Sequence, residues 1–251
     1  MNKNSYAEIF HQFYESLPRQ GPGDDTYTEL IYRLLPDLPS KPHIADMGCG
    51  TGAQTLVLAA SGGIITSIDL DLPFLQILSE NAEKRGLQDR ITTLQCSMDA
   101  LPPDVGPFDV IWSEGAIYMI GFQKGLNLWS SLLKPGGYIV VSEICWLVNN
   151  PPLELRTHSA PEIKKMQTVE HNISLIKKIG YHWIGSILLP HKAWDDYDAK
   201  QNDLIRRWRE ERKDEAVYRV LSDIERENSL FARHRGTYGD VFFIMQKPTI
   251  K

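Results

Sequence analysis

Apolar residues follow two alternating patterns along most of the chain. Short β-branched runs predict strands, and segments with apolar residues at helical spacing predict helices. The predicted strands cover residues 43–48, 63–71, 91–97, 108–115, 138–146, 182–190 and 237–247. The predicted helices between them cover residues 52–62, 73–86, 122–133 and 161–179, the last ending at Gly180.

This alternation predicts a doubly wound α/β fold, in which a Rossmann-like sheet of seven strands carries helices on both faces. Right-handed crossovers bring the loops after the parallel strands to one edge of the sheet, where such folds bind ligands. We expect the last strand, 237–247, to be antiparallel and to lie beside 182–190. The length of 251 residues suits a single domain over 1–251.

Two regions lie outside the alternation. Residues 5–17 and 26–35 have helical spacing, the segment 18–25 between them is rich in Pro and Gly, and we expect 1–36 to form an N-terminal helical cap. Residues 192–234 are charged and helical and lie between the last two predicted strands, where we expect a helical lid insertion. Its aromatic residues are candidates to face a substrate: Trp194, Tyr197, Trp208 and Tyr218.

Composition narrows the class of protein. The net charge of −5 gives the chain no overall field that would attract nucleic acid or an anionic membrane. The three cysteines, Cys49, Cys96 and Cys145, lack the spacing of metal ligands, so we expect reduced thiols, no metal and a cytoplasmic location. The N-terminus does not read as a signal peptide, and no apolar stretch is long enough to cross a membrane. Both a monomer and a homodimer remain open.

The loop after the first predicted strand contains three alternating glycines, in Asp46-Met47-Gly48-Cys49-Gly50-Thr51-Gly52. Glycines allow a sharp turn and a close approach of the backbone to a ligand, and the N–H groups that open the next helix point into the same space. Asp46 could brace this loop or hold an ammonium group through water. A tight turn without a ligand is the alternative explanation of the glycines.

The loops after the second and third predicted strands carry acids. Asp69 lies 19 residues beyond Gly50, a distance at which an acid accepts the hydroxyls of a ribose, and we expect it at an exposed loop edge. We interpret Asp71 as the N-cap of the helix that follows. In the third loop, Asp99 could accept the amino group of adenine and Met98 could contact its ring. Capping of a turn is the alternative for Asp99.

Together these segments resemble the class I S-adenosylmethionine-dependent methyltransferases over about residues 40–145. DMGCGTG resembles the glycine signature of that family, and CSMDALP resembles its adenine loop, with Ser97 where an Asp is common. FDVIWSEGAIYMI and LLKPGGYIVVSE resemble its fourth and fifth strand regions. Residues 19–24 resemble a segment that closes over the cofactor in bacterial small-molecule methyltransferases, although a flexible linker is the alternative.

The resemblance implies S-adenosylmethionine as the cofactor and methyl transfer to a small-molecule acceptor. The implied cofactor-binding residues are Arg19, Gln20, Gly23, Asp46, Gly48, Cys49, Gly50, Thr51, Gly52, Gln54, Asp69, Leu70, Ser97, Met98, Asp99, Ser113 and Glu114. Methyl transfer from a sulfonium needs proximity, exclusion of water and, for some acceptors, a base, so no fixed triad is expected.

Candidates for a base or an orienting group follow the fourth and fifth predicted strands. They are Glu114, Tyr118 and Glu143. Glu143 could instead serve as a cap or ion-pair partner. We interpret His158 as a surface histidine, and Trp112 and Trp146 as core residues more than pocket residues.

Two other functions fit parts of the pattern. A nicotinamide-dependent oxidoreductase could use the same glycine loop and Asp69, but the chain lacks a Tyr-x-x-x-Lys pair at Tyr118 or Tyr181. A non-catalytic module that only binds S-adenosylmethionine is the second alternative.

Overall fold

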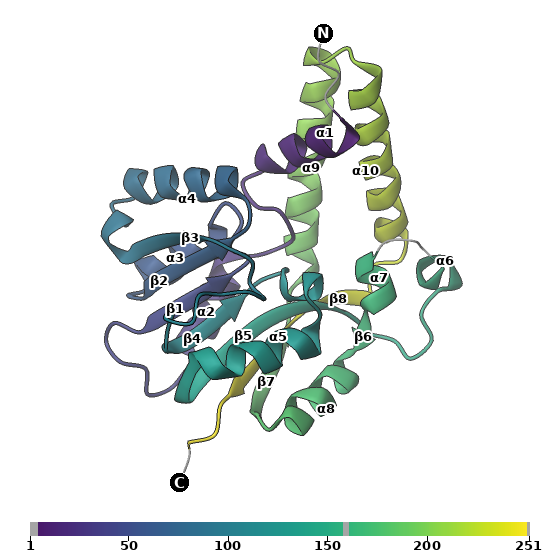
Figure 1. Cartoon of the computed structure of the whole chain (residues 1–251). Coiled ribbons are helices and arrows are strands. Elements are labelled where there is room, and N and C mark those ends of the chain that lie inside the picture. The colour runs from purple at the N-terminus through teal and green to yellow at the C-terminus, as the bar shows by residue number, and fades with distance from the viewer. Residues whose placement is uncertain (1–4, 158–160, 250–251) are drawn as a thin grey trace.

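A central sheet organises the chain in the computed structural model, which describes residues 5–157 and 161–249 (Figure 1). The strands on its continuous path, in order across the sheet, are β3 (Ile91–Gln95), β2 (Ile64–Asp69), β1 (His43–Met47), β4 (Phe108–Ser113), β5 (Leu133–Trp146), β8 (Tyr238–Gln246) and β7 (His182–Leu188). The first five are parallel, and β8 lies antiparallel between β5 and β7. The predicted α/β fold and its antiparallel last strand are confirmed.

Helices cover both faces of the sheet. The longer ones are α1 (Tyr6–Glu15), α2 (Asp25–Arg33), α3 (Ala53–Ala60), α4 (Leu72–Lys84), α5 (Phe122–Trp129), α8 (Val169–Ile179), α9 (His191–Glu211) and α10 (Glu215–Arg233). The short ones are α6 (Leu153–Arg156), α7 (Pro161–Lys165) and the 3₁₀ turns η1 (Gln88–Arg90), η2 (Ile117–Met119) and η3 (Ser130–Leu132). Apolar residues of α5 and α8 pack on one face, and those of α2 and α3 pack on the other.

The predicted helix over 161–179 is wrong in one respect, because the structure divides it into α7 and α8. Between them a short strand, β6 (Gln167–Thr168), pairs with Cys145 and Trp146 at the end of β5. The Thr168 hydroxyl then accepts from the His171 N–H at 3.2 Å and so caps α8, a signal that favours a new helix start at this point. The predicted end at Gly180 is confirmed, with that glycine in the left-handed conformation.

The N-terminal helix and the insertion share one hydrophobic cluster. Side chains of α1, including Ile9 and Phe13, pack with α9 and α10 around Trp208 and Leu221. Figure 1 shows α9 and α10 rising from the sheet as two long helices with α1 across them. The predicted cap and the predicted lid are thus joined at one end of the molecule.

Among the helices of the described ranges, none is both long and apolar enough to cross a membrane.

Candidate active site

The glycine loop connects β1 to α3. Gly48 and Gly50 have φ angles of +71° and +54°, which residues with a Cβ atom rarely adopt. The backbone N–H groups of Gly48 and Cys49 donate to the Ile68 carbonyl at 2.8 and 3.0 Å, so the turn is fixed to the end of β2. A Cβ on Gly50 would lie 2.5 Å from Oε1 of Gln20. The loop therefore needs glycine where another segment approaches it.

Asp46 lies beneath this loop and is fully buried. Its carboxylate accepts from the Thr55 hydroxyl and, at 3.1 Å, from Nε2 of Gln54. Burial raises the pKa of Asp46 to about 7, although both hydrogen bonds act to lower it. Gln54 also donates to the Cys49 carbonyl at 3.4 Å. Asp46 and Gln54 thus brace the loop from below.

Asp69 turns back under the same loop from the end of β2. Its Oδ2 accepts from the Gly50 N–H at 2.8 Å, and its Oδ1 accepts from the Asp71 N–H at 3.0 Å. The expected exposed loop edge is therefore wrong, since Asp69 is only partly exposed and shapes the glycine turn. Asp71 accepts from the Phe74 N–H at 3.1 Å, which confirms the predicted helix cap. Leu70, between the two acids, is 66% exposed.

The third loop adjoins the glycine loop. The Met98 methyl group lies 3.3 Å from where a Cβ on Gly48 would be, and the Met98 carbonyl accepts from Nε1 of the buried Trp129 at 2.8 Å. Asp99 accepts from the Ser97 hydroxyl and pairs with Nζ of Lys124 at 2.6 Å. These donors, with Lys124 first, hold the pKa of Asp99 below its usual range.

The segment before α2 lies against the glycine loop. Oε1 of Gln20 accepts from the N–H and the hydroxyl of Thr51 at 3.1 and 3.2 Å. The Thr51 hydroxyl also lies 3.3 Å from the Pro18 carbonyl, to which it donates. Tyr197 of α9 donates from its hydroxyl to the Gln20 carbonyl at 2.9 Å. The first loop, the N-terminal segment and the insertion therefore meet at one place.

Arg19 enters the site from the same segment. One guanidinium nitrogen donates to Oε2 of Glu114 at 3.0 Å, and another pairs with Asp25 at 2.9 Å. A Cβ on Gly23 would lie 1.9 Å from this guanidinium, so glycine at that position allows Arg19 to lie where it does. Glu114 also accepts from the Thr28 hydroxyl at 2.7 Å and from Nε1 of Trp112 at 2.9 Å. With three donors on its carboxylate, Glu114 fits a group that positions Arg19 better than a base.

Part of the chain is similar to a known protein family. Residues 44–137 match the family model described as "Methyltransferase domain". A solved S-adenosylmethionine-dependent methyltransferase from Geobacter sulfurreducens, in complex with S-adenosylhomocysteine, superposes with a TM-score of 0.81 at 23% identity, over 94% of this chain and 96% of that one. The chain therefore has the class I methyltransferase fold, and residues 44–137 are similar to the methyltransferase domain.

Two curated relatives add to this comparison. The uncharacterised protein YjhP of Escherichia coli is 26% identical over 195 residues, which cover 75% of this chain and 78% of YjhP. A phosphoethanolamine N-methyltransferase of Triticum aestivum is 25% identical over 179 residues, which cover 70% of this chain and 34% of the wheat protein. The chain thus spans well under half the length of the wheat protein.

Two of the candidate residues, Ser113 and Cys49, lie inside the protein. The Ser113 hydroxyl donates to the Met47 carbonyl at 2.9 Å and ties β4 to β1. The Cys49 thiol is buried, and burial raises its pKa well above the usual range. Both residues support the loop from within, and their side chains do not reach its surface.

The remaining two base candidates lie at the end of β5 and on η2. Glu143 is buried, and burial, together with the charge of Asp240, raises its pKa to about 8. Tyr118 lies on η2, and its carbonyl accepts from Nζ of Lys165 at 3.1 Å. Asp240 itself is buried on β8 with a pKa raised to about 7, chiefly by desolvation. Two buried acids therefore lie beyond the glycine loop.

The insertion places only part of its aromatic set at the site. Tyr197 contacts Gln20, but Trp208 packs on Phe13 and Trp194 packs on Phe231 and Tyr238. Tyr218 is partly exposed and lies 3.5 Å from the Arg209 carbonyl. The structure therefore does not bring the four candidates together, since Trp208 packs on α1 and Trp194 contacts Phe231 of α10 and Tyr238 of β8. Trp112 and Trp146 are buried, as predicted, and His158 lies outside the described residues.

Thr28 and Asp240 were not predicted as site residues from the sequence, although Thr28 contacts Glu114 and the charge of Glu114 acts on Asp240. Thr28 is fully buried on α2 and donates to Glu114, and nothing in its sequence context marks it. Asp240 carries a recognisable signal, since it is a single acid inside the apolar run of the last predicted strand.

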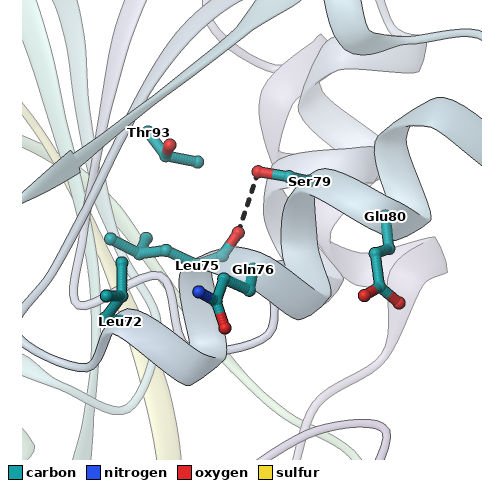
Figure 2. A pocket seen from close by; sticks show the side chains of 6 residues that line it. All are labelled: Leu72, Leu75, Gln76, Ser79, Glu80 and Thr93. Atoms are coloured by element: carbon teal, nitrogen blue, oxygen red, sulfur yellow. Dashed lines mark hydrogen bonds between the residues drawn. The ribbon is translucent and has the colours of Figure 1, made fainter.

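A surface hollow elsewhere on the molecule does not belong to this site. Figure 2 shows it beside α4, lined by Leu72, Leu75, Gln76, Ser79, Glu80 and Thr93. The Ser79 hydroxyl bonds back to the Leu75 carbonyl within the helix at 2.9 Å. No candidate site residue lines this hollow, so we do not assign it a part in the chemistry.

Proposed function

We propose that this chain transfers a methyl group from S-adenosylmethionine to a small-molecule acceptor. The observation that supports it best is the convergence of three segments on the glycine loop, namely the end of β2, the third loop and residues 18–23, the last of which Tyr197 also contacts. Bound S-adenosylmethionine would supply an activated methyl group on a sulfonium.

The residues at the loop fit the parts of this cofactor. Asp69 is the candidate for the ribose hydroxyls, and exposed Leu70 and Met98 are candidates to flank the adenine ring. Asp99 and Ser97 would accept from or donate to the adenine edge. The guanidinium of Arg19, held by Glu114, is the group in this cluster suited to a carboxylate.

The other candidate residues would act through their backbone atoms or from beneath the loop. Gly48, Gly50, Thr51 and Gly52 would present the loop, whereas Asp46, Cys49, Gln54 and Ser113 would keep its shape. Gln20 and Gly23 would hold the N-terminal segment over the cofactor, so that water is excluded during transfer. Tyr118 and Glu143 remain candidates for contact with the acceptor.

Formation of S-adenosylhomocysteine tests this proposal. The purified protein is incubated with S-adenosylmethionine and a small-molecule extract of cells, and the product is measured by mass spectrometry. We expect product with the wild type and none with Gly50→Val, whose side chain would occupy the space now taken by Gln20 Oε1. Intact binding of S-adenosylhomocysteine without any turnover would instead indicate a non-catalytic binding module.

A further inference from the structure

A row of acids follows the carboxyl edge of the sheet. Its members, in the order of their strands, are Asp69 on β2, Asp46 on β1, Glu114 after β4, Glu143 on β5 and Asp240 on β8. Members of the row affect one another through their negative charges. Asp69 and Glu114 both raise the pKa of Asp46, and Glu114 raises the pKa of Asp240. Asp240 in turn raises the pKa of Glu143.

Three of these acids have partners that account for them. Asp69 and Asp46 accept hydrogen bonds from the glycine loop and from α3, and Glu114 pairs with Arg19. Glu143 differs from them. Glu143 is only 6% exposed, and its Oε2 has no hydrogen-bond partner within the described part of the chain. A buried carboxyl oxygen without a donor is costly to keep, so it calls for a function.

Glu143 lies where an acceptor would be needed. The last residue of β5 that pairs with β4 is Val141, opposite Ser113, so Glu143 stands two positions beyond the end of β4. The turn η2, which carries Tyr118, contacts both β5 and α7. This places the carboxyl at the same edge as Glu114, on the side of the site away from Asp69.

The nearby basic group does not neutralise Glu143. The charge of Lys165 on α7 lowers the pKa of Glu143, but it is the smallest of the three causes and is outweighed by burial and by Asp240. Nζ of Lys165 donates to the Tyr118 carbonyl at 3.1 Å, and Oε2 of Glu143 has no hydrogen-bond partner in the described ranges. Lys165 therefore does not donate a hydrogen bond to Oε2 of Glu143.

Asp240 acts on Glu143 through its charge and does not provide a second acceptor beside it. In the register of β5 and β8, Glu143 is opposite Val241 and Asp240 is opposite Ile144. Since neighbouring residues of a strand point to opposite faces, the two carboxyls lie on different faces of the sheet. Glu143 is thus the group that can accept a hydrogen bond, and Asp240 strengthens the negative field around it.

We propose that Glu143 binds the ammonium group of an amine acceptor, with Asp240 as the second negative charge. This inference rests on the proposed function. A primary or secondary ammonium would donate to Oε2 of Glu143 and favour its carboxylate form, with Asp240 adding negative charge from the other face of the sheet, whereas a neutral alcohol or an anion would bring no compensating positive charge. The Glu143 carboxylate can then take one proton from the ammonium, which leaves a nitrogen lone pair for the attack on a methyl group.

Saturation-transfer NMR with three probes of equal length tests this inference. The probes are n-pentylammonium, 1-pentanol and pentanoate, each added to the wild-type protein with and without S-adenosylhomocysteine. We expect transfer to pentylammonium that clearly exceeds transfer to the other two. Equal transfer to pentanol, or no transfer to pentylammonium, would overturn the inference.

Variants assign the effect to the two acids. We expect Glu143→Gln to weaken pentylammonium binding about tenfold or more, the scale of a hydrogen bond to a charged group, and Asp240→Asn to weaken it less. The control is Glu170→Gln, an exposed acid of α8 whose charge also reaches the end of β5, and we expect it to change nothing. Unchanged binding in Glu143→Gln would overturn the inference.

Two other experimental outcomes can also be interpreted. If Glu143→Gln does not fold, the wild-type comparison of the three probes decides alone. If S-adenosylhomocysteine fails to bind while pentylammonium binding depends on Glu143, the proposed function fails and the amine subsite stands.

Discussion

At the scale of single residues, the surroundings of each carboxylate decide what it can do. Asp46 and Glu114 are buried and fully engaged with donors, which leaves them as supports for the loop and for Arg19. Asp69 is less buried and retains lone pairs beyond its two backbone donors. An aspartate therefore supports the loop at the end of β1, where Asp46 lies, and is a candidate to bind the ligand at the end of β2, where Asp69 lies.

Asp69 and Asp71 form a matched pair for mutation. We expect Asp69→Ala to weaken S-adenosylhomocysteine binding by about 1.5–3 kcal/mol, because it removes acceptors for the ligand and for the Gly50 N–H. We expect Asp71→Ala to leave affinity unchanged and to cost about 0.5–2 kcal/mol of stability through loss of the α4 cap. Calorimetric titration and urea unfolding measure the two effects, and a reversed assignment would move the ribose contact to Asp71.

The buried acid Glu143 makes stability depend on pH. Its pKa is raised from 4.5 to about 8 in the folded protein, so the folded state holds a proton that the unfolded state releases within that window. Stability from this group is therefore present below pH 4.5 and is lost as the pH rises towards 8. Asp240 and Lys165 are the other charges that act on it.

We accordingly expect Glu143→Gln to gain stability relative to the wild type as the pH rises. The difference in unfolding free energy between the two proteins should grow by at least about 1 kcal/mol between pH 5 and pH 8.5, since one pKa unit corresponds to 1.36 kcal/mol. Urea unfolding at both pH values measures it. A difference that stays constant with pH would mean that Glu143 titrates alike in both states.

Residues of the site differed in how well the sequence revealed them. Asp46, Asp69 and Asp99 follow predicted strands in a recognisable order, so their positions at one edge could be predicted. The hydrogen bond of Gln20 to Thr51 and that of Thr28 to Glu114 could not be predicted, because they join distant parts of the chain and form only through tertiary packing. The partial burial of Asp69 was missed for the same reason, since it depends on how the glycine loop folds back over it.

At the scale of elements, the N-terminal segment is fixed to the loop by few contacts. Gln20 bonds to Thr51 through its side chain and to the Tyr197 hydroxyl through its carbonyl. A segment held mainly by a few hydrogen bonds opens locally at modest cost. Arg19 within it is a trypsin site that is largely covered, its side chain being 14% exposed.

Limited trypsin digestion therefore reports on this segment. We expect Tyr197→Phe to speed cleavage after Arg19 about fivefold, as loss of a hydrogen bond worth about 1 kcal/mol would allow. The control is Tyr218→Phe, whose hydroxyl lies 3.5 Å from the Arg209 carbonyl within the insertion and does not touch the segment. Mass spectrometry of the fragment beginning at Gln20 gives the rate. Equal rates in the two variants would show that Tyr197 does not hold the segment.

The strands and helices of the sheet could be predicted because their hydrophobic periodicity reflects burial on known faces. Two elements could not. The short β6 has only two residues, too few for a pattern, and its existence depends on the end of β5. The packing of α1 on α9 and α10 joins segments almost 200 residues apart, for which local sequence carries no signal.

At the scale of the whole molecule, the topology produces the site. With β1 between β2 and β4, the glycine loop lies at the centre of the carboxyl edge, and the loops after β2 and β4 flank it. The antiparallel β8 brings its N-terminal end, with Asp240, to the same edge beside the end of β5. The candidate cofactor residues thus lie on one side of the glycine loop, and the acids proposed for the acceptor lie on the other.

The choice of cofactor tests this account most directly. Isothermal titration calorimetry compares S-adenosylmethionine, S-adenosylhomocysteine and NADH as ligands of the wild-type protein. The account predicts that both adenosyl compounds bind, because the glycine loop, Asp69 and the Arg19 segment together match a nucleoside joined to an amino acid, and that NADH does not bind. Tight binding of NADH, with no heat from S-adenosylhomocysteine, would contradict it.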